Sequence, residues 1–138
     1  MTKQPWTIAR TASMAEAHRM MREHDIRHLP VLDNGELVGV VSRGDLHLLE
    51  TIADFSLDEV QVEEAMTADP FYVTGDTALD DVAEIMAQKK YGSAIVVGRN
   101  GVEGIFTATD ACRVLAELIR RYTGMSADLE VHHTGYSR

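Results

Sequence analysis

The sequence has little cysteine and no long hydrophobic run, and these absences limit where the protein works. Cys112 is the only cysteine, so an internal disulfide is impossible and a reducing compartment fits. The opening residues lack the apolar stretch of a signal peptide, and no apolar run approaches the length of a membrane span. We therefore expect a cytoplasmic protein without a membrane partner.

Positive charge is also scarce. The 138 residues include 13 Lys and Arg against 22 Asp and Glu, a formal net charge of −9. A duplex nucleic acid must be held by a basic face, and the pairs Lys89-Lys90 and Arg120-Arg121 are too short to form one. The charge balance argues against a nucleic-acid partner, but it does not exclude a phosphorylated small ligand, which a few donors at a helix N-terminus can hold.

The residue patterns of familiar catalytic sites are missing as well. The sequence shows no Ser-His-Asp order, paired-carboxylate cleft, glycine-rich phosphate loop or metal cluster. His132 and His133 are adjacent but have no third ligand at helix or hairpin spacing, so a solvated tail explains them better than a metal does. We predict that the protein is not an enzyme and needs no metal or other cofactor.

The chain does contain an internal repeat, in which one sequence unit occurs twice. Residues 1–45 align without a gap on residues 66–110, a shift of 65 positions. Most matches are apolar or turn positions, as a repeated supersecondary unit requires. The matched pairs include Met1 and Met66, Thr2 and Thr67, Pro5 and Pro70, Trp6 and Phe71, Ile8 and Val73, Gly39 and Gly104, Ser42 and Thr107, and Asp45 and Asp110.

The first copy predicts the order strand, helix, strand, strand, helix. After an extended stretch at residues 6–8, Ser13 and Glu16 form a capping-box pattern that starts a helix ending near residue 24. Asn34-Gly35 marks a hairpin turn between strands at residues 28–32 and 37–41. A second helix begins near residues 42–45.

The second copy predicts the same order. We expect a helix over Thr77–Lys90, stopped by Gly92, and a hairpin over residues 94–107. Its turn dipeptide Asn100-Gly101 lies one place later than Asn34-Gly35, which predicts a different turn type. The last helix is expected from about Thr109 to Gly124.

These patterns divide the chain into four parts. We expect repeat 1 over residues 1–54, a linker with its own short helix over 55–65, repeat 2 over 66–124 and a tail over 125–138. A second capping-box pattern, Ser56 with Glu59, marks the linker helix.

Both hairpins end in the same polar pattern, glycine, two apolar residues, Ser or Thr, two further residues and Asp. The copies are Gly39 to Asp45 and Gly104 to Asp110. In a single copy such a pattern is most commonly a helix cap. A carboxylate at a helix N-terminus can also accept the hydroxyls of a ribose, and the glycine would let a ligand approach the backbone. Both interpretations stay open.

The doubled unit, the Met-Thr-x-x-Pro openings, the strand Arg27-His28-Leu29-Pro30-Val31 and the two Gly-x-x-Ser/Thr-x-x-Asp ends resemble a cystathionine β-synthase (CBS) domain pair, or Bateman module. The resemblance covers about residues 1–122. It implies an α/β fold of two β-α-β-β-α repeats packed by their sheets with pseudo-two-fold symmetry, and adenosyl ligands in two clefts between the repeats.

The same resemblance implies roles for individual residues. Asp45 and Asp110 would bind ribose, Ser42 and Thr107 would lie beside ribose or phosphate, and Val40 and Ile105 would contact the base. The opposite repeat's opening strand would contribute Pro5 to one cleft and Pro70 to the other. The residues before the second strand of each repeat would add Arg27 and His28 in repeat 1, and Tyr91 and Gly92 in repeat 2. Because basic groups occur only in the first of these pairs, the two clefts should not bind one species equally well.

The implied function is a stand-alone regulatory module that binds AMP, ADP, ATP or S-adenosylmethionine and relays occupancy to a protein partner or to the interface of a homodimer. The alternatives are an interaction module whose clefts stay empty and, less favoured, a small nucleotide-hydrolysing enzyme. His28 has two open interpretations, a pH-sensing or phosphate-facing group, and a packed residue at a strand start.

Overall fold

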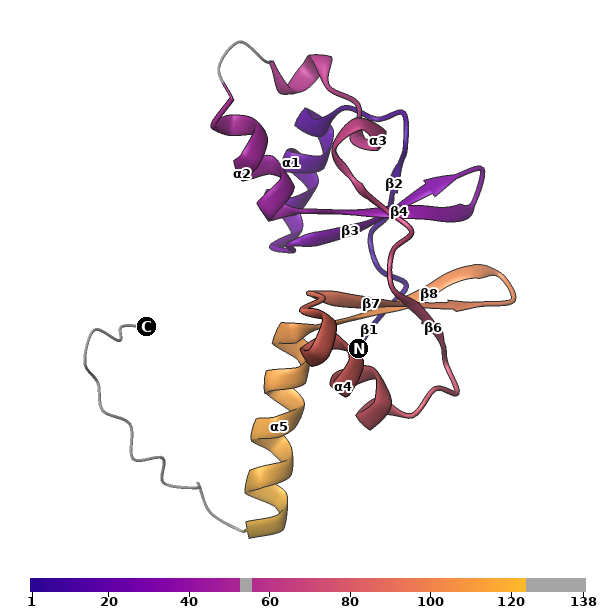
Figure 1. The fold of residues 1–138 in the computed structure, drawn as a ribbon, viewed down its shortest axis with the longest axis vertical. Coiled ribbons are helices and arrows are strands. Elements are labelled where there is room, and N and C mark those ends of the chain that lie inside the picture. The colour runs from indigo at the N-terminus through magenta and orange to yellow at the C-terminus, as the bar shows by residue number, and fades with distance from the viewer. Residues whose placement is uncertain (53–55, 124–138) are drawn as a thin grey trace, which may run out of the picture. The chain divides into compact units, whose positions relative to one another are not determined.

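The computed structural model describes residues 1–52 and 56–123 (Figure 1). The predicted tail (125–138), the predicted linker start at Phe55 and the predicted helix end at Gly124 lie outside the described residues. The chain divides into two compact units, Met1–Ala108 and the part that begins at Thr109, and each unit is described by itself.

Repeat 1 forms the predicted element order. Ser13 caps the first helix by accepting a hydrogen bond from the Glu16 backbone N–H (3.1 Å). The opening strand that pairs within the repeat lies one to two residues later than the predicted residues 6–8. The elements are β1 (Thr2–Lys3), β2 (Ile8–Ala9), α1 (Met14–His24), β3 (His28–Asp33), β4 (Glu36–Ser42) and α2 (Arg43–Glu50).

The linker and repeat 2 contain a 3₁₀ turn, three α-helices and four strands within the described residues. These are η1 (Leu57–Glu59), α3 (Val62–Ala65), β5 (Thr67–Ala68), β6 (Tyr72–Thr74), α4 (Leu79–Lys89), β7 (Ser93–Gly98), β8 (Gly101–Thr107) and α5 (Ala108–Thr123). Ala108 ends the first compact unit, and the rest of α5 belongs to the second.

Three local expectations are corrected. Helix α4 begins at Leu79 rather than Thr77, and Lys90, not Gly92, ends it, because Lys90 takes the left-handed φ of 61°. In the linker, the side chain of Ser56 accepts from the Asp58 N–H, and the carboxylate of Glu64 accepts from the Gln61 N–H. The predicted pairing of Ser56 with Glu59 is therefore wrong.

The two hairpin turns differ, as the one-place slip predicts. Asn34 and Gly35 have positive φ values of 51° and 86°, which is typical of a two-residue type I′ turn. In the second hairpin Gly101 has a φ of 97° and directly follows the turn, the place of a glycine bulge. Equivalent strands are thus joined by different turns.

Each sheet borrows its edge strand from the other repeat. One sheet has the order β2-β3-β4-β5 and the other β1-β8-β7-β6. In the antiparallel pairings Thr2 lies opposite Ile105 and Thr67 lies opposite Val40. Gln4 and Asp69, at equivalent positions in the two copies, have φ values of 50° and 53° just after these short strands. The Met-Thr openings therefore join the opposite sheet before the chain turns back into its own repeat.

The glycines of the repeated motif are explained by this exchange. A Cβ at Gly39 would meet the sulfur of Met66 and lie 2.8 Å from the Thr67 carbonyl oxygen. A Cβ at Gly104 would lie 2.7 Å from the sulfur of Met1 and 3.0 Å from the Thr2 carbonyl oxygen. Within the described residues, the close approach at these glycines is made by the exchanged strands.

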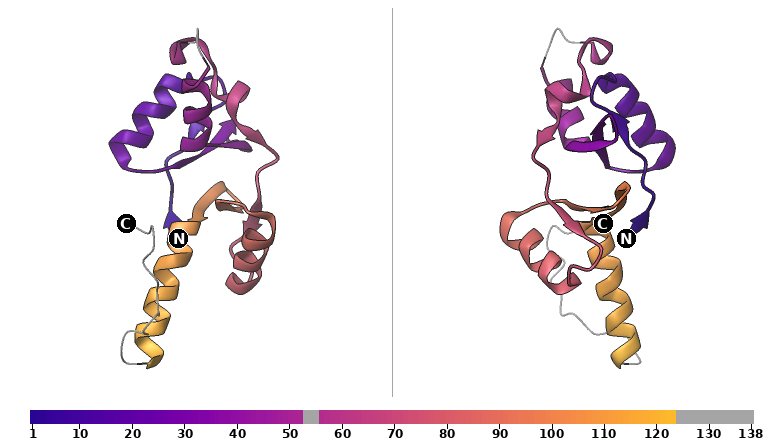
Figure 2. Two further views of the ribbon diagram at one scale, coloured as in Figure 1. Left: turned by 60° about the vertical axis from the view of Figure 1, so that its left-hand side comes forward. Right: turned by 90° about the vertical axis from the view of Figure 1, so that its right-hand side faces the viewer.

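The two sheets pack against each other, as predicted. Strand β4 contacts β8 across the repeats, and the tip at Gly101 approaches the Gly35 carbonyl oxygen. Figure 2 shows the helices α1 and α2 on the side of their sheet that faces away from the other repeat, with α4 in the matching place on repeat 2. This arrangement brings β4 of one repeat beside β8 of the other.

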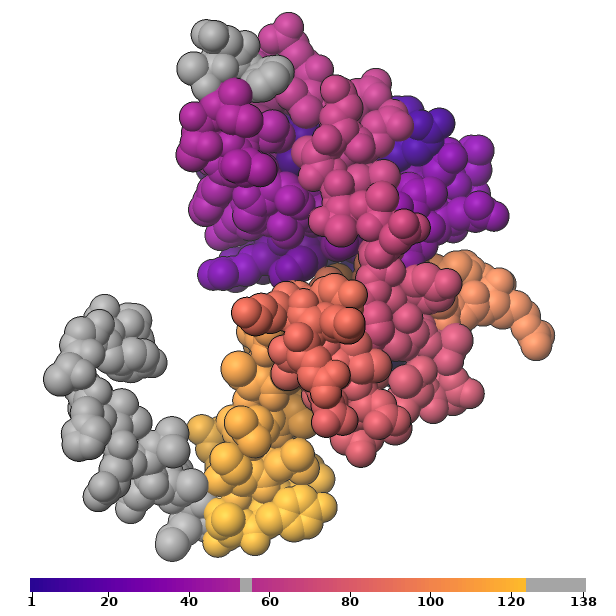
Figure 3. All heavy atoms as spheres, in the orientation of Figure 1, coloured from indigo at the N-terminus to yellow at the C-terminus, as the bar shows by residue number. Residues whose placement is uncertain are grey.

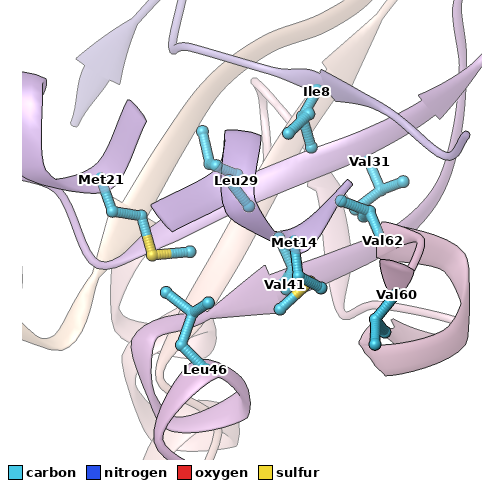
Figure 4. Packing of buried hydrophobic residues seen from close by; sticks show 10 residues of the cluster. Ile8, Met14, Met21, Leu29, Val31, Val41, Leu46, Val60 and Val62 are labelled. Carbon is cyan, nitrogen blue, oxygen red and sulfur yellow. The ribbon is translucent and has the colours of Figure 1, made fainter. Parts of the chain in front are cut away.

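The core of repeat 1 includes part of the linker. Val60 and Val62 pack with residues of α1, the sheet and α2 (Figure 4). Arg10 ties the same linker down through ion pairs with Asp33 (3.1 Å) and Glu63 (2.7 Å). The other members of this core are Ile8, Met14, Ala17, Met21, Leu29, Val31, Val41 and Leu46.

Candidate functional site

The first polar motif forms a complete helix cap. The Asp45 Oδ2 atom accepts hydrogen bonds from the Ser42 N–H (2.8 Å) and the Ser42 hydroxyl (3.1 Å). The Asp45 N–H in turn donates to the Ser42 hydroxyl oxygen (3.3 Å). The cap interpretation is confirmed for repeat 1. These bonds hold a half-buried carboxylate rigidly at the N-terminus of α2, and each of them that involves the carboxylate uses Oδ2.

Arg27 and His28 lie beside the Ser42–Asp45 cap at the start of α2. The Arg27 carbonyl accepts a hydrogen bond from the Arg43 N–H at the start of α2 (2.9 Å). His28 lies opposite Ser42 in the β3–β4 ladder. Burial away from water and the Arg27 charge lower the pKa of His28 below its usual value, and the Asp45 carboxylate partly opposes this shift. His28 and Asp45 are therefore close enough to interact electrostatically.

Gly92 of repeat 2 lies directly against this cluster. A Cβ at Gly92 would be 3.0 Å from His28 Nε2, so the bare glycine makes room for the imidazole ring. The Gly92 carbonyl accepts from the Ala108 N–H (3.1 Å), the counterpart of the bond between Arg27 and Arg43. The contact of His28 with Gly92 thus joins the predicted site residues of the two repeats.

The second motif has the same strand geometry. Thr107 ends β8 opposite Ser93, as Ser42 lies opposite His28. Ser93 is 8% exposed, so this position is small and buried where repeat 1 has an imidazole. Asp110 lies in the first turn of α5 and forms an ion pair with Arg113 (3.4 Å). Asp110 belongs to the second compact unit.

The remaining predicted residues lie along the exchanged strands. Val40 is half-buried opposite Thr67, whereas Ile105 is buried opposite Thr2. Pro5 and Pro70 each follow the turn by which an exchanged strand returns to its own repeat, and Pro70 is the more buried of the two.

Aromatic pairs stand next to these residues, and the sequence interpretation left most of their members outside the site. Trp6 stacks on His24, with ring centroids 3.7 Å apart and an interplanar angle of 8°. Phe71 stacks on Tyr91 at 5.1 Å and 29°. Of these four, only Tyr91 is a predicted site residue. The signal was present in the alignment of Trp6 with Phe71.

A separate hollow of about 400 Å³ lies between the two hairpin tips, toward the right of Figure 3. It is lined by residues that include Asn34, Glu36, Arg99 and Val102. None of the predicted site residues lines it. Over residues 1–52 and 56–123, no group of three His, Cys, Asp or Glu side chains is placed to hold a metal ion, and no helix is long and apolar enough to span a membrane.

Comparison with known proteins supplies the family context. The CBS domain family model matches residues 1–48 and 62–117. The chain is 35% identical over 105 residues to inosine-5′-monophosphate dehydrogenase of Korarchaeum cryptofilum and 27% identical over 110 residues to the CBS domain-containing protein YhcV of Bacillus subtilis. The match covers 75% and 80% of this chain, but 21% of the dehydrogenase and 78% of YhcV. The dehydrogenase match thus involves only a small part of that enzyme.

Solved structures share this fold. A protein named for acetoin utilization (AcuB) from Vibrio cholerae has a TM-score of 0.77 at 30% identity, covering 92% of this chain and 94% of that one. The CBS domain pair of protein MJ0100, in complex with 5′-methylthioadenosine and S-adenosyl-L-methionine, has a TM-score of 0.74 at 28% identity, with 85% and 93% coverage. CBSX2 in complex with AMP has a TM-score of 0.71 at 28% identity, with 87% and 95% coverage.

Proposed function

The chain belongs to the CBS domain family, and we propose that it is a regulatory module that binds an adenosyl ligand between its two repeats, residues 1–54 and 66–124, joined by the linker 55–65. The observation that carries this proposal is the cluster of Ser42, Asp45, Arg27 and His28 against Gly92. It places a fixed carboxylate, a hydroxyl and basic groups where the two repeats meet. Structures with this fold hold 5′-methylthioadenosine, S-adenosylmethionine or AMP, which supports the ligand class.

The side chains of the cluster match the ribose and phosphate groups of an adenosyl ligand. Because the cap bonds use Oδ2 of Asp45, the Oδ1 atom is left to accept a ribose hydroxyl. Ser42 lies at the N-terminus of α2, where backbone donors and the helix dipole favour ribose or phosphate oxygens. Val40 and Ile105 are the base contacts of this proposal. In the second cleft Asp110 binds the ribose and Thr107 lies beside ribose or phosphate, and the opening strands contribute Pro5 to one cleft and Pro70 to the other.

The two clefts are proposed to prefer different ligands. Arg27 and His28 give the repeat 1 end positive charge that can pair with phosphate, whereas Gly92 and Ser93 stand at the equivalent places in repeat 2. A phosphorylated ligand such as AMP, ADP or ATP therefore suits the first end, and S-adenosylmethionine or another ligand without phosphate suits the second.

Binding would act by shifting an equilibrium between arrangements of the repeats. A ligand that contacts both repeats shifts this equilibrium only by its difference in affinity for the two arrangements. The exchanged strands link each repeat to the other, so movement at one cleft reaches both sheets. The enzymes among the relatives match the chain over a small part of their own length, which favours a regulatory rather than a catalytic role.

We also propose a homodimer. Leu79 and Ile85 of α4 are 48% and 37% exposed. Helix α5 has apolar residues at Val114, Leu118 and Tyr122, which share one face at helical spacing. These surfaces suit a second copy of the chain, and the ligand signal would pass to that interface or to a protein partner. A monomer in sedimentation experiments at micromolar concentration would contradict this part of the proposal.

The test is a thermal-shift screen with AMP, ADP, ATP, S-adenosylmethionine, NAD and GTP. A ligand at about a hundred times its dissociation constant should stabilise the fold by about 2.7 kcal/mol, a shift of several degrees. Asp45→Asn should abolish the rise in melting temperature that AMP, ADP or ATP causes by binding at the repeat 1 end. Ser13→Ala removes a helix cap of the same chemistry away from the cluster, and it should lower the melting temperature without changing the ligand shift.

One observation favours the alternative function. The bonds between Ser42 and Asp45 are complete without a ligand, as an interaction module with empty clefts would require. In that case no nucleotide shifts the melting temperature, and Asp45→Asn changes only the stability of the free protein.

A further inference from the structure

The hollow between the two hairpin tips has no role in the proposed function. Its volume is about 400 Å³, and both repeats line it, through residues 34–37 of the first hairpin and residues 97 and 99–102 of the second. Both hairpins lie within Met1–Ala108, so the hollow belongs to one compact unit. Pockets that hold small molecules have volumes of roughly 300–1,000 Å³. The hollow is therefore large enough for a small ligand, and no residue of the proposed adenosyl site lines it.

The walls of the hollow are aliphatic. Leu37, Val97 and Val102 line it, and each of these residues is half-buried. Leu37 lies opposite Leu32 in the first hairpin, and the two valines lie opposite each other in the second. An aliphatic group placed against these side chains leaves water, which favours binding. The walls therefore suit the hydrocarbon part of a ligand.

The rim of the hollow carries one charge of each sign. Glu36 lines it from repeat 1 and Arg99 from repeat 2, and both residues are exposed. Arg10, whose backbone N–H donates to the first hairpin, already pairs with Asp33 and Glu63. Within residues 1–52 and 56–123, neither Glu36 nor Arg99 has an ion-pair partner. The two charges thus line the same hollow without neutralising each other.

The turns that carry these charges have a defined backbone geometry. Glu36 directly follows the type I′ turn of Asn34 and Gly35. A Cβ at Gly101 would lie 3.3 Å from the Gly35 carbonyl oxygen, so the two tips nearly touch. Asn34 and Asn100 also line the hollow, and their side chains carry amide donors and acceptors. Because the turns are already formed, the backbone loses little conformational freedom when a ligand binds.

We propose that the hollow between the hairpin tips binds a free α-amino acid with an aliphatic side chain. The carboxylate of the amino acid pairs with Arg99, its ammonium group pairs with Glu36, and its side chain packs on the aliphatic walls. A zwitterion matches both rim charges at once, whereas a simple anion or cation leaves one of them unmatched. Because the two charges come from different repeats, an occupied hollow favours arrangements in which the hairpin tips stay together.

The test is a titration of the full chain with L-leucine, followed through the backbone amide signals in nuclear magnetic resonance spectra. L-leucine should cause saturable shifts at Gly35 and Gly101, which line the hollow, and no shift at Gly75, which does not. Isocaproate lacks the ammonium group of leucine, and isoamylamine lacks its carboxylate. Each analogue loses one charge-assisted contact and should therefore bind about tenfold more weakly than L-leucine.

Variants of the rim test the same contacts from the side of the protein. Glu36→Gln and Arg99→Gln should each weaken L-leucine about tenfold, because each removes the partner of one ligand charge. Both residues are exposed, so the variants should fold as wild type does. Glu84→Gln and Arg22→Gln remove exposed charges of the same two kinds away from the hollow, and they should leave the affinity unchanged.

Three results would each overturn the proposal. The first is the absence of a saturable shift at Gly35 and Gly101 with L-leucine. The second is binding of isocaproate or isoamylamine as tightly as L-leucine, and the third is wild-type affinity in Glu36→Gln and Arg99→Gln. None of these results bears on the adenosyl site, because calorimetry with AMP measures binding at the Asp45 cluster separately.

Discussion

At the scale of the residue, the contact of His28 with Gly92 is where the repeats differ most. Repeat 1 places an imidazole at the start of its second strand, and repeat 2 accommodates it by having glycine at the facing position. The equivalent position in repeat 2 is the buried Ser93. A symmetric fold thus holds an asymmetric cluster of charge.

The lowered pKa of His28 predicts a pH dependence of stability. The unfolded chain takes up the proton at a higher pH than the folded chain, so the free energy of unfolding falls as the pH drops from the unfolded pKa through the folded one. The stabilisation is fully present above about pH 6.5, the usual pKa of histidine. His28→Gln removes this proton uptake and should therefore lose less stability than wild type between pH 8 and pH 5.

Urea unfolding at several pH values measures this difference. His18→Gln, a change on α1 away from the cluster, is the control for the general effect of removing a histidine. Parallel pH profiles for His28→Gln and wild type would contradict the prediction.

At the scale of the element, the exchanged strands depend on glycine. Gly39→Ala places a Cβ against Met66 and the Thr67 carbonyl, so β5 must move away from β4. We expect a loss of about 1–3 kcal/mol in the free energy of unfolding, the usual range for overpacking. Gly75→Ala is the matched control, because a Cβ there would meet nothing within 4 Å.

Denaturant unfolding of the two variants tests this explanation. Equal stabilities for Gly39→Ala and Gly75→Ala would mean that the close approach of β5 does not require glycine at position 39. The same comparison can be made at Gly104, where Met1 and Thr2 take the places of Met66 and Thr67.

Element prediction succeeded where a local signal was sufficient and failed where it was not. Ser13 and Asn34-Gly35 specify a cap and a turn through their own side chains and φ preferences, so the sequence located both. Lys90 takes a left-handed φ that glycine usually adopts, so the neighbouring Gly92 was mistaken for the helix end. Gly92 instead accommodates His28, a contact that no local pattern contains.

At the scale of the whole molecule, strand exchange couples the repeats. The sheet of repeat 1 is completed by β5 and the sheet of repeat 2 by β1. Unfolding of either repeat removes an edge strand from the other, so we predict a single cooperative transition for the first compact unit. Fluorescence of Trp6 reports repeat 1 and hydrogen exchange of the β6, β7 and β8 amides reports the part of repeat 2 in the same unit, and the two urea dependences should coincide. A separate, earlier transition in the fluorescence curve would show that repeat 1 unfolds on its own.

The sequence by itself determined the doubled α/β unit, the order of its elements and the positions of both polar motifs, because the 65-residue repeat records periodicity, turns and caps along the chain. It also located the Arg27-His28 pair, whose charge has no counterpart in repeat 2. Only the tertiary structure decided which strand borders which sheet, why Gly39 and Gly104 are glycine, that His28 lies against Gly92 and that Trp6 stacks on His24. These are contacts between residues distant in the chain, and they depend on how the two sheets pack, which the pattern within either copy does not specify.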